Sequence, residues 1–264
     1  MPIDWQKRLE RLRPRTDPDG IARRWKSAVL TGRPVLYGVR HGTTKANIED
    51  EFRGLEDYKL EEKGITEAHE AAEWFLEHKV KPVLIVCSPL SRARRTAETL
   101  GEALGAEVRV DEELKPLDVG KFTGEEKDKA WEHFTHYLDH PDEPIPDGES
   151  VNHFADRGIK AIDYWLDYAG KHGPVILAFH TSNIVILDCY LRTGEVGMGC
   201  RPEEKDIVAP GGIVAVSAAR GIEPVFKDVK AEDEKDDPDK AKHEEYEKEL
   251  PETADKDHEM AEVG

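Results

Sequence analysis

The sequence predicts an α/β fold, a three-layer α/β/α sandwich with a mostly parallel central sheet. Short apolar runs typical of buried strands alternate along the chain with longer segments that carry apolar residues at helical spacing. This alternation builds βαβ units, which place helices on both faces of one sheet. One apolar run ends before the pair Arg40-His41 and another before His180. Parallel sheets present such strand ends at one ligand-binding edge.

The predicted strands are short runs in which valine, isoleucine and leucine dominate, as in buried parallel strands. In chain order they cover residues 35–39, 83–87, 107–110, 175–179 and 213–217. The run at 107–110 is weaker than the others. The sheet is therefore expected to be built mainly from the four stronger runs.

Helical periodicity covers residues 66–78, 90–104, 128–138, 151–168 and 182–191. Three of these segments have recognisable starts. Thr66 opens the first, Ser88-Pro89 opens the second with proline in its first turn, and Ser150 precedes the fourth. No internal repeat and no second composition domain is evident in this part of the chain. Residues 34–226 are therefore predicted to form one domain.

Composition changes at both ends of the chain. Residues 1–33 are basic, carry tryptophan at helical spacing and predict a helical extension. From residue 227 to 264 there are 7 lysines against 16 acidic residues and almost no large apolar residues. Such a segment buries too little surface to offset its ordering entropy, so a solvated tail or a loose charged helix is predicted. Its role stays open between a solubilising spacer and a contact for an unknown protein.

Net charge and cysteine content narrow the function classes. The chain of 264 residues has a net charge of −18, which disfavours non-specific binding to nucleic acid or to an anionic membrane. No apolar stretch is long enough to span a bilayer, and the N-terminus lacks the apolar region of a signal peptide. The 3 cysteines show no metal-ligand spacing and fit reduced thiols. A cytoplasmic protein is expected.

Four side chains are expected to converge on one pocket. Arg40, His41 and His180 lie at strand ends, and Arg92 lies in the first turn of the helix after the second strand, where free N–H groups and the helix dipole favour anions. Two arginines and two histidines without clustered carboxylate or cysteine ligands indicate a phosphate site that needs no metal or other cofactor. One imidazole attacks phosphorus, while the cations stabilise the charge on the phosphoryl oxygens.

Several ordered motifs make residues 35–216 resemble the histidine phosphatase superfamily, which also contains the cofactor-dependent phosphoglycerate mutases. The motifs are RHGxTxxN at 40–47, the loop 52–54, an LTxxG-like element at 60–66, SPLxRAxxTA at 88–97 and a PxGES-like element at 146–150. The resemblance implies a phosphoglycerate mutase-like fold in which His41 is the phosphorylated nucleophile. It also implies that Arg40, Arg92 and His180 bind the phosphoryl group and that Asn47, Arg53 and Thr181 contribute to substrate binding.

One departure from the family pattern concerns proton donation to the leaving oxygen. Many members carry a glutamate where this chain has Pro116, which has no proton to donate. Asp118 is the leading substitute as general acid, with Glu113 behind it. The alternative is that Asp118 is only a turn residue and that a good leaving group needs no acid.

Three functions follow from different classes. The first is a phosphatase, a histidine acid phosphatase-type phosphoric monoester hydrolase acting on a small phosphorylated substrate or a phosphoprotein. The second is a phosphoglycerate mutase-type transferase, which in the family has a longer insertion than residues 125–145 provide. The third is a catalytically weak phosphate- or phosphoprotein-binding module. His133, His136 and His140 imitate a metal site but are more simply interpreted as exposed residues of a polar helix.

Overall fold

The computed structural model of the chain describes residues 36–193, 208–217 and 221–228. The predicted N-terminal extension at 1–33 and residues 229–264 of the predicted acidic segment 227–264 lie outside the described residues. The first two residues of that segment, Lys227 and Asp228, are the last residues of a strand. Among the helices in the described ranges, none is long and apolar enough to cross a membrane.

A six-stranded sheet forms the centre of the fold, in the order β3-β2-β4-β1-β5-β6. β1, β4, β2 and β3 pair in parallel, whereas β5 pairs antiparallel with both β1 and β6. The strands span Leu36–Arg40 (β1), Leu84–Cys87 (β2), Val108–Val110 (β3), Val175–Phe179 (β4), Val208–Ser217 (β5) and Gly221–Asp228 (β6). The sheet is therefore mostly parallel, as predicted.

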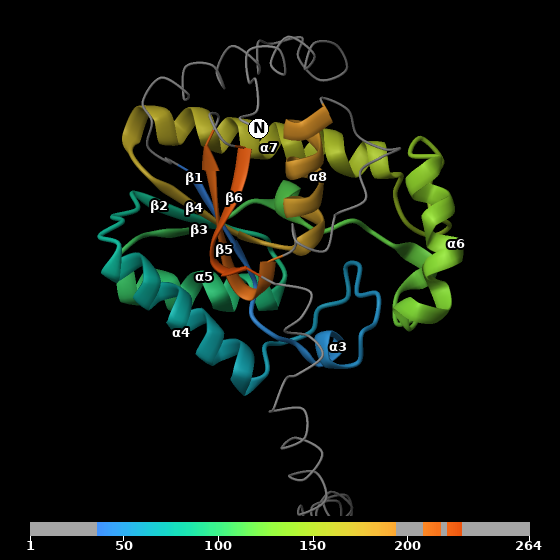
Figure 1. The fold of residues 1–264 in the computed structure, drawn as a ribbon, viewed down its shortest axis with the longest axis horizontal. Coiled ribbons are helices and arrows are strands. Elements are labelled where there is room, and N and C mark those ends of the chain that lie inside the picture. Colours follow the sequence, from blue (N-terminus) through green and yellow to red (C-terminus); the bar gives the residue numbers. More distant parts are fainter. Residues whose placement is uncertain (1–35, 194–207, 218–220, 229–264) are drawn as a thin grey trace, which may run out of the picture. The chain divides into compact units, whose positions relative to one another are not determined.

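Helices cover both faces of the sheet, as Figure 1 shows, with α4 and α5 below it and α7 and α8 above it. Their bounds are Glu62–Glu77 (α4), Ser91–Leu104 (α5), Val151–His172 (α7) and Thr181–Thr193 (α8). Alternate residues of β1, β2 and β4 face opposite helical layers, so the sheet separates two apolar cores. On β1, Leu36 packs in the core with α7, while Tyr37 packs in the core with α4. The three-layer α/β/α prediction is confirmed.

Smaller elements join these layers along one side of the molecule (Figure 1). Helix α3 spans Lys45–Ile48, helix α6 spans Lys127–Asp139, and two short 3₁₀ helices span Glu112–Leu114 and Gly120–Phe122. Phe52, from the loop after α3, packs against Phe134 of α6 with ring centroids 4.7 Å apart. This aromatic contact connects the loop between α3 and α4 with the segment that precedes α7.

Two predicted helix starts were wrong. Helix α4 begins at Glu62, one turn before Thr66, because Leu60 is bridged to Thr44 and the Glu61 N–H donates to Thr43 O at 3.0 Å. Helix α5 begins at Ser91, so Pro89 precedes the helix instead of lying in its first turn. By contrast, the Ser150 prediction is confirmed, because its hydroxyl accepts a hydrogen bond from the N–H of the third residue of α7 at 3.2 Å.

Strand β6 was not predicted. It contains Pro224 and several charged residues, a composition that disfavours strand assignment from sequence. It lies at the edge of the sheet, where only one side is paired and such residues are tolerated.

Strand register decides which residues meet at the carboxyl edge. Arg40 of β1 pairs with Phe179 of β4, so the next residues, His41 and His180, leave two adjacent strands side by side. The backbone continues this register, with the His41 N–H donating to Phe179 O at 3.1 Å. β2 adjoins β4 on its other side, and there Ser88 follows the strand and donates its N–H to Ala178 O at 3.0 Å. Three neighbouring strands thus place polar residues at one edge.

Candidate functional site

His41 and His180 meet in the interior of the protein. Their rings pack edge to face with centroids 5.2 Å apart, and the residues are only 1% and 3% exposed. Two imidazoles buried side by side without a carboxylate between them are unusual in a structural core, where buried polar groups are paired. The predicted pairing of the two strand-end histidines is present.

A backbone carbonyl group sets the tautomer of His41. Nδ1 lies 2.7 Å from Gly42 O, and a carbonyl can only accept, so Nδ1 carries the proton of the neutral ring. Nε2 then holds the lone pair. Gly42 is required here because a Cβ atom would lie 2.1 Å from Gly64 O, where the chain crosses the first turn of α4. This close crossing keeps the loop after β1 against α4.

His180 is held through its opposite nitrogen. Nε2 lies 2.8 Å from the Ser88 hydroxyl, while Nδ1 is buried and has no hydrogen-bond partner among the described residues. The buried hydroxyl of Thr181, the next residue, also lacks a partner there. Ser88 was not identified from the sequence as a site residue. Its position directly after a buried strand, next to the strand of His180, is the signal that could have found it.

Arg92 reaches the same region from α5 and is 1% exposed. Its Nη1 donates to Glu56 O at 2.7 Å and its Nη2 to Gly54 O at 3.2 Å, which holds the guanidinium against the loop after α3. Its Nε is buried and has no partner in the described part of the chain. The guanidinium is thus positioned by carbonyl groups of the loop and keeps donor capacity unused.

The N-terminus of α5 does not supply the anion site that the sequence predicted. The Asp57 carboxylate accepts from the Ser91 N–H and from the Ser91 hydroxyl, both at 2.6 Å, and so caps the helix itself. A carboxylate at this end satisfies the helix dipole and competes with an external anion. The donors that Ser91 could offer to an anion are therefore already used, whereas the Nε of Arg92 is not.

Arg40 and Arg53 complete a cluster of three arginines around the histidines. Arg40 ends β1, and its Nη1 donates to Val208 O of β5 at 2.7 Å. Nη1 of Arg53 is buried and has no hydrogen-bond partner among the described residues. Both guanidinium charges act on His41 and His180. The sequence prediction that Arg53 reaches the pocket region agrees with this placement.

Burial and positive charge keep both histidines neutral. Burial lowers the pKa of His41 well below its ordinary value, and the charges of His180 and Arg92 lower it further. The pKa of His180 is lowered in the same way, by burial first and by Arg92 next. Burial, together with the charge of Arg53, also lowers the pKa of Arg92 to about 10. The cluster therefore holds excess positive charge beside an unprotonated imidazole, which suits the binding of an anion.

Asn47 was predicted to line the pocket, and its carboxamide oxygen is used elsewhere. Oδ1 accepts from the N–H of Thr44 at 3.1 Å and from the hydroxyl of the same residue at 2.9 Å. These bonds close the start of α3. Only the amide N–H₂ group remains for a substrate.

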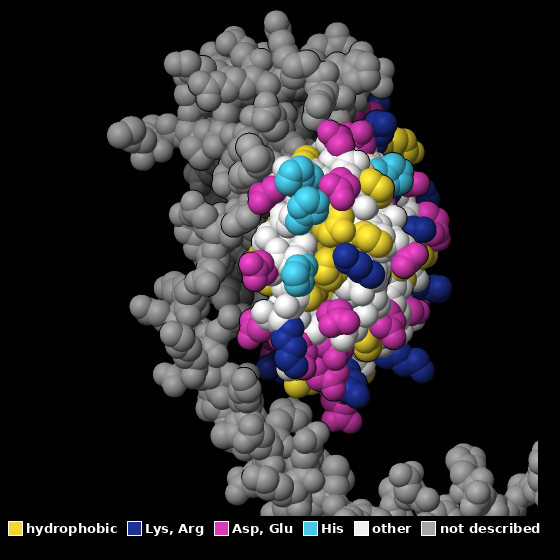
Figure 2. All heavy atoms as spheres, turned by 90° about the vertical axis from the view of Figure 1, so that its right-hand side faces the viewer, with side chains coloured by type: hydrophobic (Ala, Val, Ile, Leu, Met, Phe, Trp, Pro, Cys, Tyr) yellow, Lys and Arg dark blue, Asp and Glu magenta, His cyan; other side chains and the backbone are white. Residues whose placement is uncertain are grey.

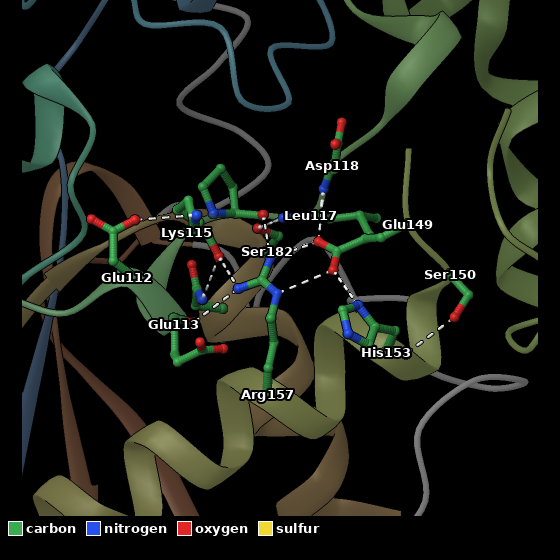
Figure 3. A network of polar contacts seen from close by, with 12 residues as sticks. Glu112, Glu113, Lys115, Leu117, Asp118, Glu149, Ser150, His153, Arg157 and Ser182 are labelled. Atoms are coloured by element: carbon green, nitrogen blue, oxygen red, sulfur yellow. Dashed lines mark hydrogen bonds and ion pairs between the residues drawn. The ribbon is translucent and has the colours of Figure 1, made fainter. Parts of the chain in front are cut away.

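Asp118, the predicted general acid, lies in an irregular segment between the two 3₁₀ helices. Its Oδ1 accepts from the Gly120 N–H at 3.1 Å, which is a turn contact. Its Oδ2 has no hydrogen bond among the described residues, and the carboxyl group points away from Arg157 in Figure 3. Glu113, the second candidate, is exposed. The turn role of Asp118 is present, and one carboxyl oxygen remains available.

A polar cluster that the sequence did not predict lies behind this segment (Figure 3). Glu149 belongs to the PxGES-like element just before α7. Its carboxylate contacts Arg157 Nη2 at 2.6 Å, His153 Nδ1 at 2.9 Å and the Asp118 N–H at 3.0 Å. Because Glu149 precedes α7, helical spacing does not link it to Arg157, and no local signal in the sequence suggests the pair.

His133 and His136 of α6, and His140 directly after the helix, form no metal site with other described residues. His136 Nε2 lies 3.0 Å from the Glu143 carboxylate, and the rings of His136 and His140 stack with centroids 4.3 Å apart. Among the described residues, no group of three potential ligands is arranged to hold a metal ion. Figure 2, which faces the side of the molecule that carries α6, shows histidine side chains interspersed with acidic and basic ones.

Four of the site residues share one property. Buried donors or acceptors without partners in the described residues belong to Arg53, Arg92, His180 and Thr181. Buried polar atoms are ordinarily paired, so a cluster of unpaired ones marks a place built for a polar ligand. Together with the arginine charges, these atoms fit a phosphoryl group.

Comparison with known proteins agrees with this geometry. Residues 36–201 match the model of the histidine phosphatase superfamily (branch 1). A probable phosphoglycerate mutase GpmB from Cronobacter sakazakii is 31% identical over 165 residues, which cover 60% of this chain and 73% of that protein. The resemblance inferred from the motifs is confirmed.

Solved structures with the same fold include enzymes of two kinds. A mycobacterial glucosyl-3-phosphoglycerate phosphatase in complex with VO3 superposes with a TM-score of 0.61 at 26% identity, covering 75% of this chain and all of that chain. A phosphoglycerate mutase from Thermus thermophilus superposes with a TM-score of 0.55 at 26% identity, covering 74% of this chain and 99% of that chain. The phosphoglycerate mutase-like fold is thereby shown.

Proposed function

Because the chain belongs to the histidine phosphatase superfamily, we propose that it is a metal-independent phosphatase that hydrolyses a phosphomonoester through a phosphohistidine on His41. The observation that carries the proposal is the pair of neutral, buried histidines, 5.2 Å apart, within reach of the charges of three arginines. The substrate is a small phosphorylated molecule or a phosphorylated protein side chain.

In the first step, the lone pair on His41 Nε2 forms a bond to phosphorus while the bond to the ester oxygen breaks. The Nδ1 proton stays hydrogen-bonded to Gly42 O, which stabilises the cationic ring of the phosphohistidine. Arg92, with its unpaired Nε, and His180, with its unpaired Nδ1, offer donors to the phosphoryl oxygens. These contacts strengthen as charge accumulates on the oxygens in the transition state.

The leaving alkoxide needs a proton in the same step. Asp118 is the proposed donor, because Oδ2 has no hydrogen bond among the described residues while Oδ1 is held by the Gly120 N–H. The carboxylate then takes a proton from the attacking water in the second step. That water displaces His41 from phosphorus, and inorganic phosphate leaves. A general acid of this kind contributes about 10² to 10⁴-fold in rate.

Acidic working conditions follow from the same electrostatics. A lowered pKa keeps His41 unprotonated, and so nucleophilic, at a pH where an exposed histidine is largely cationic. An activity of the histidine acid phosphatase type is therefore part of the proposal.

Transfer to a second substrate oxygen is the alternative, and it fits the phosphoglycerate mutases among the relatives. The segment between the 3₁₀ helix at Gly120–Phe122 and the start of α7 holds only one helix, α6. A closed mutase pocket needs a longer insertion there, so water is the favoured acceptor. Measuring inorganic phosphate released from 3-phosphoglycerate, beside any 2-phosphoglycerate formed, distinguishes the two reactions.

Hydrolysis of p-nitrophenyl phosphate with excess EDTA tests the proposal directly. We expect turnover that survives chelation, disappears in His41→Ala, and persists in the matched control His133→Ala, which removes an exposed histidine. Quenching in alkaline denaturant during turnover of radiolabelled substrate should trap label on His41, because a phosphohistidine is stable in alkali and hydrolyses in acid. Loss of activity on chelation, or full activity in His41→Ala, would contradict the proposal.

A further inference from the structure

Arg157 and Glu149 form a largely buried ion pair next to the proposed site. Their side chains, each 14% exposed, meet at 2.6 Å. The same guanidinium donates to three backbone carbonyl groups of residues 113–116, namely Glu113 O at 2.9 Å, Lys115 O at 3.0 Å and Pro116 O at 2.9 Å. One side chain of α7 thus contacts most of the segment that leads to Asp118.

Glu149 holds the other end of that segment. Its Oε1 accepts from the Asp118 N–H at 3.0 Å, and its own N–H donates to Asp118 O at 3.2 Å (Figure 3). The guanidinium of Arg157 also packs over the Phe154 ring, 5.0 Å from its centroid. Arg157 lies in α7 and Glu149 just before it, and together they hydrogen-bond to both ends of residues 113–118.

These contacts are needed because the segment 115–118 is neither helix nor strand. Its carbonyl groups have no ladder of backbone donors, and Pro116 has no N–H to offer in return. Buried backbone groups require partners, and here a guanidinium with five donors supplies them. The backbone of this loop is thus held in place by one side chain pair.

The ion pair also excludes one candidate for proton donation. Burial alone would raise the pKa of Glu149, but hydrogen bonds from Arg157 and from the Asp118 N–H bring it below its ordinary value. Glu149 is therefore ionised at neutral pH and has no proton to give. Its role toward the reaction is to hold the segment that carries Asp118.

We infer that Arg157 is a positioning residue, which acts with Glu149 to place the Asp118 carboxyl for proton transfer to the leaving oxygen. The inference rests on the proposed function and gives a role to a residue outside the cluster of His41, His180 and their neighbouring arginines. A displacement of about 1 Å in a reacting group is enough to lower a rate by about 10²-fold. Asp118 protonates the leaving oxygen in the first step, which kcat/KM reports, so the effect on kcat/KM should depend on the leaving group.

The test compares the full-length wild type with Arg157→Gln on phenyl phosphate, a poor leaving group, and p-nitrophenyl phosphate, a good one. We expect kcat/KM on phenyl phosphate to fall about 10-fold or more beyond any fall in kcat/KM on p-nitrophenyl phosphate. Arg157→Lys keeps the charge without the planar fork and should lie between. Lys160→Gln, an exposed substitution on the same helix, is the matched control and should match the wild type.

Equal losses on both substrates would overturn the inference, because a merely structural role lowers the active fraction for every substrate alike. Should Arg157→Gln not fold, the ratio measured with Arg157→Lys decides in the same way. Failure of the proposed function is distinguishable from failure of this inference. It would appear as activity that persists in His41→Ala.

Discussion

Arg92 and Arg157 are two largely buried arginines in opposite helical layers, and their surroundings differ. Arg157 faces the carboxylate of Glu149 and donates to three carbonyl groups. Arg92 donates to two carbonyl groups, lies near the charge of Arg53 and, with a smaller effect, that of Asp57, and keeps an unpaired Nε among the described residues. A buried arginine that its own chain neutralises stabilises the fold. One whose strongest charged neighbour is another arginine is suited to an external anion.

Removing the charge of Arg92 should impair activity at the proposed anion site while the stability of the fold stays nearly unchanged. In Arg92→Gln we expect kcat/KM for p-nitrophenyl phosphate to fall about 10² to 10³-fold, because a donor to the developing charge is lost. The free energy of unfolding should stay within about 1 kcal/mol, since the lost hydrogen bonds are offset by relief of a buried, unneutralised cation. Steady-state kinetics and urea denaturation measure the two quantities. A large fall in stability would contradict the contrast with Arg157.

Removing the carboxylate of Glu149 should have the opposite result. Glu149→Ala leaves Arg157 buried beside only neutral carbonyl groups, so the free energy of unfolding should fall by about 3 kcal/mol. The control is Glu112→Ala, which breaks an exposed pair with Lys115 and should change it by less than about 0.5 kcal/mol. Urea denaturation at pH 7 compares them. Equal effects in the two variants would show that the buried pair stabilises no more than a surface one.

Substitution of Arg53 should have a smaller effect on kcat/KM, and this effect should depend on pH. Its positive charge disfavours protonation of His41 and so contributes to the lowered pKa of that ring. In Arg53→Gln this contribution disappears, the pKa of His41 rises, and the acid limb of kcat/KM should move to higher pH. We also expect about a 10-fold lower kcat/KM at the optimum, because a charged hydrogen bond to the substrate is lost. An acid limb that stays in place, or moves to lower pH, would refute the electrostatic account.

The pKa of Cys87 is shifted mainly by burial and little by neighbouring charges. A test at Cys87 is expected to show the smallest effect on the protein. Burial raises the pKa of this thiol to about 11. Because the thiolate is the reactive form, iodoacetamide at pH 8 should leave Cys87 unlabelled in the folded protein and label it in urea. Peptide mass spectrometry reports the labelling. Rapid modification of the native protein would mean that the strand is accessible.

Much of the site could be predicted from the sequence for a simple reason. His41 and His180 follow strands whose apolar composition marks them as central and parallel, and parallel strands share a carboxyl edge. Arg92 and Arg53 lie in motifs of fixed order along the chain. The helix starts were less predictable, because α4 begins where a loop crosses it and not at the local signal Thr66.

Other contacts depend on side chains that are distant in the chain. Asp57 caps α5 across 34 residues, and Ser88 meets His180 across 92. Arg157 meets the loop of Pro116 across 41. No local pattern encodes such pairs, since each requires the packed layers to bring two segments together. The expectation of a helix-end anion site failed for this reason, because the competing carboxylate comes from another loop.

The α/β architecture and the four residues expected at the carboxyl edge could be predicted from the sequence alone, because strand periodicity and motif order are local properties. The packed structure was needed to see which buried arginine forms an ion pair with a carboxylate of the chain and which does not. It was also needed to see which nitrogen of His41 is free and how the Pro116 loop is held. These outcomes depend on distances between atoms of different layers, and those distances exist only once the sheet and helices have packed.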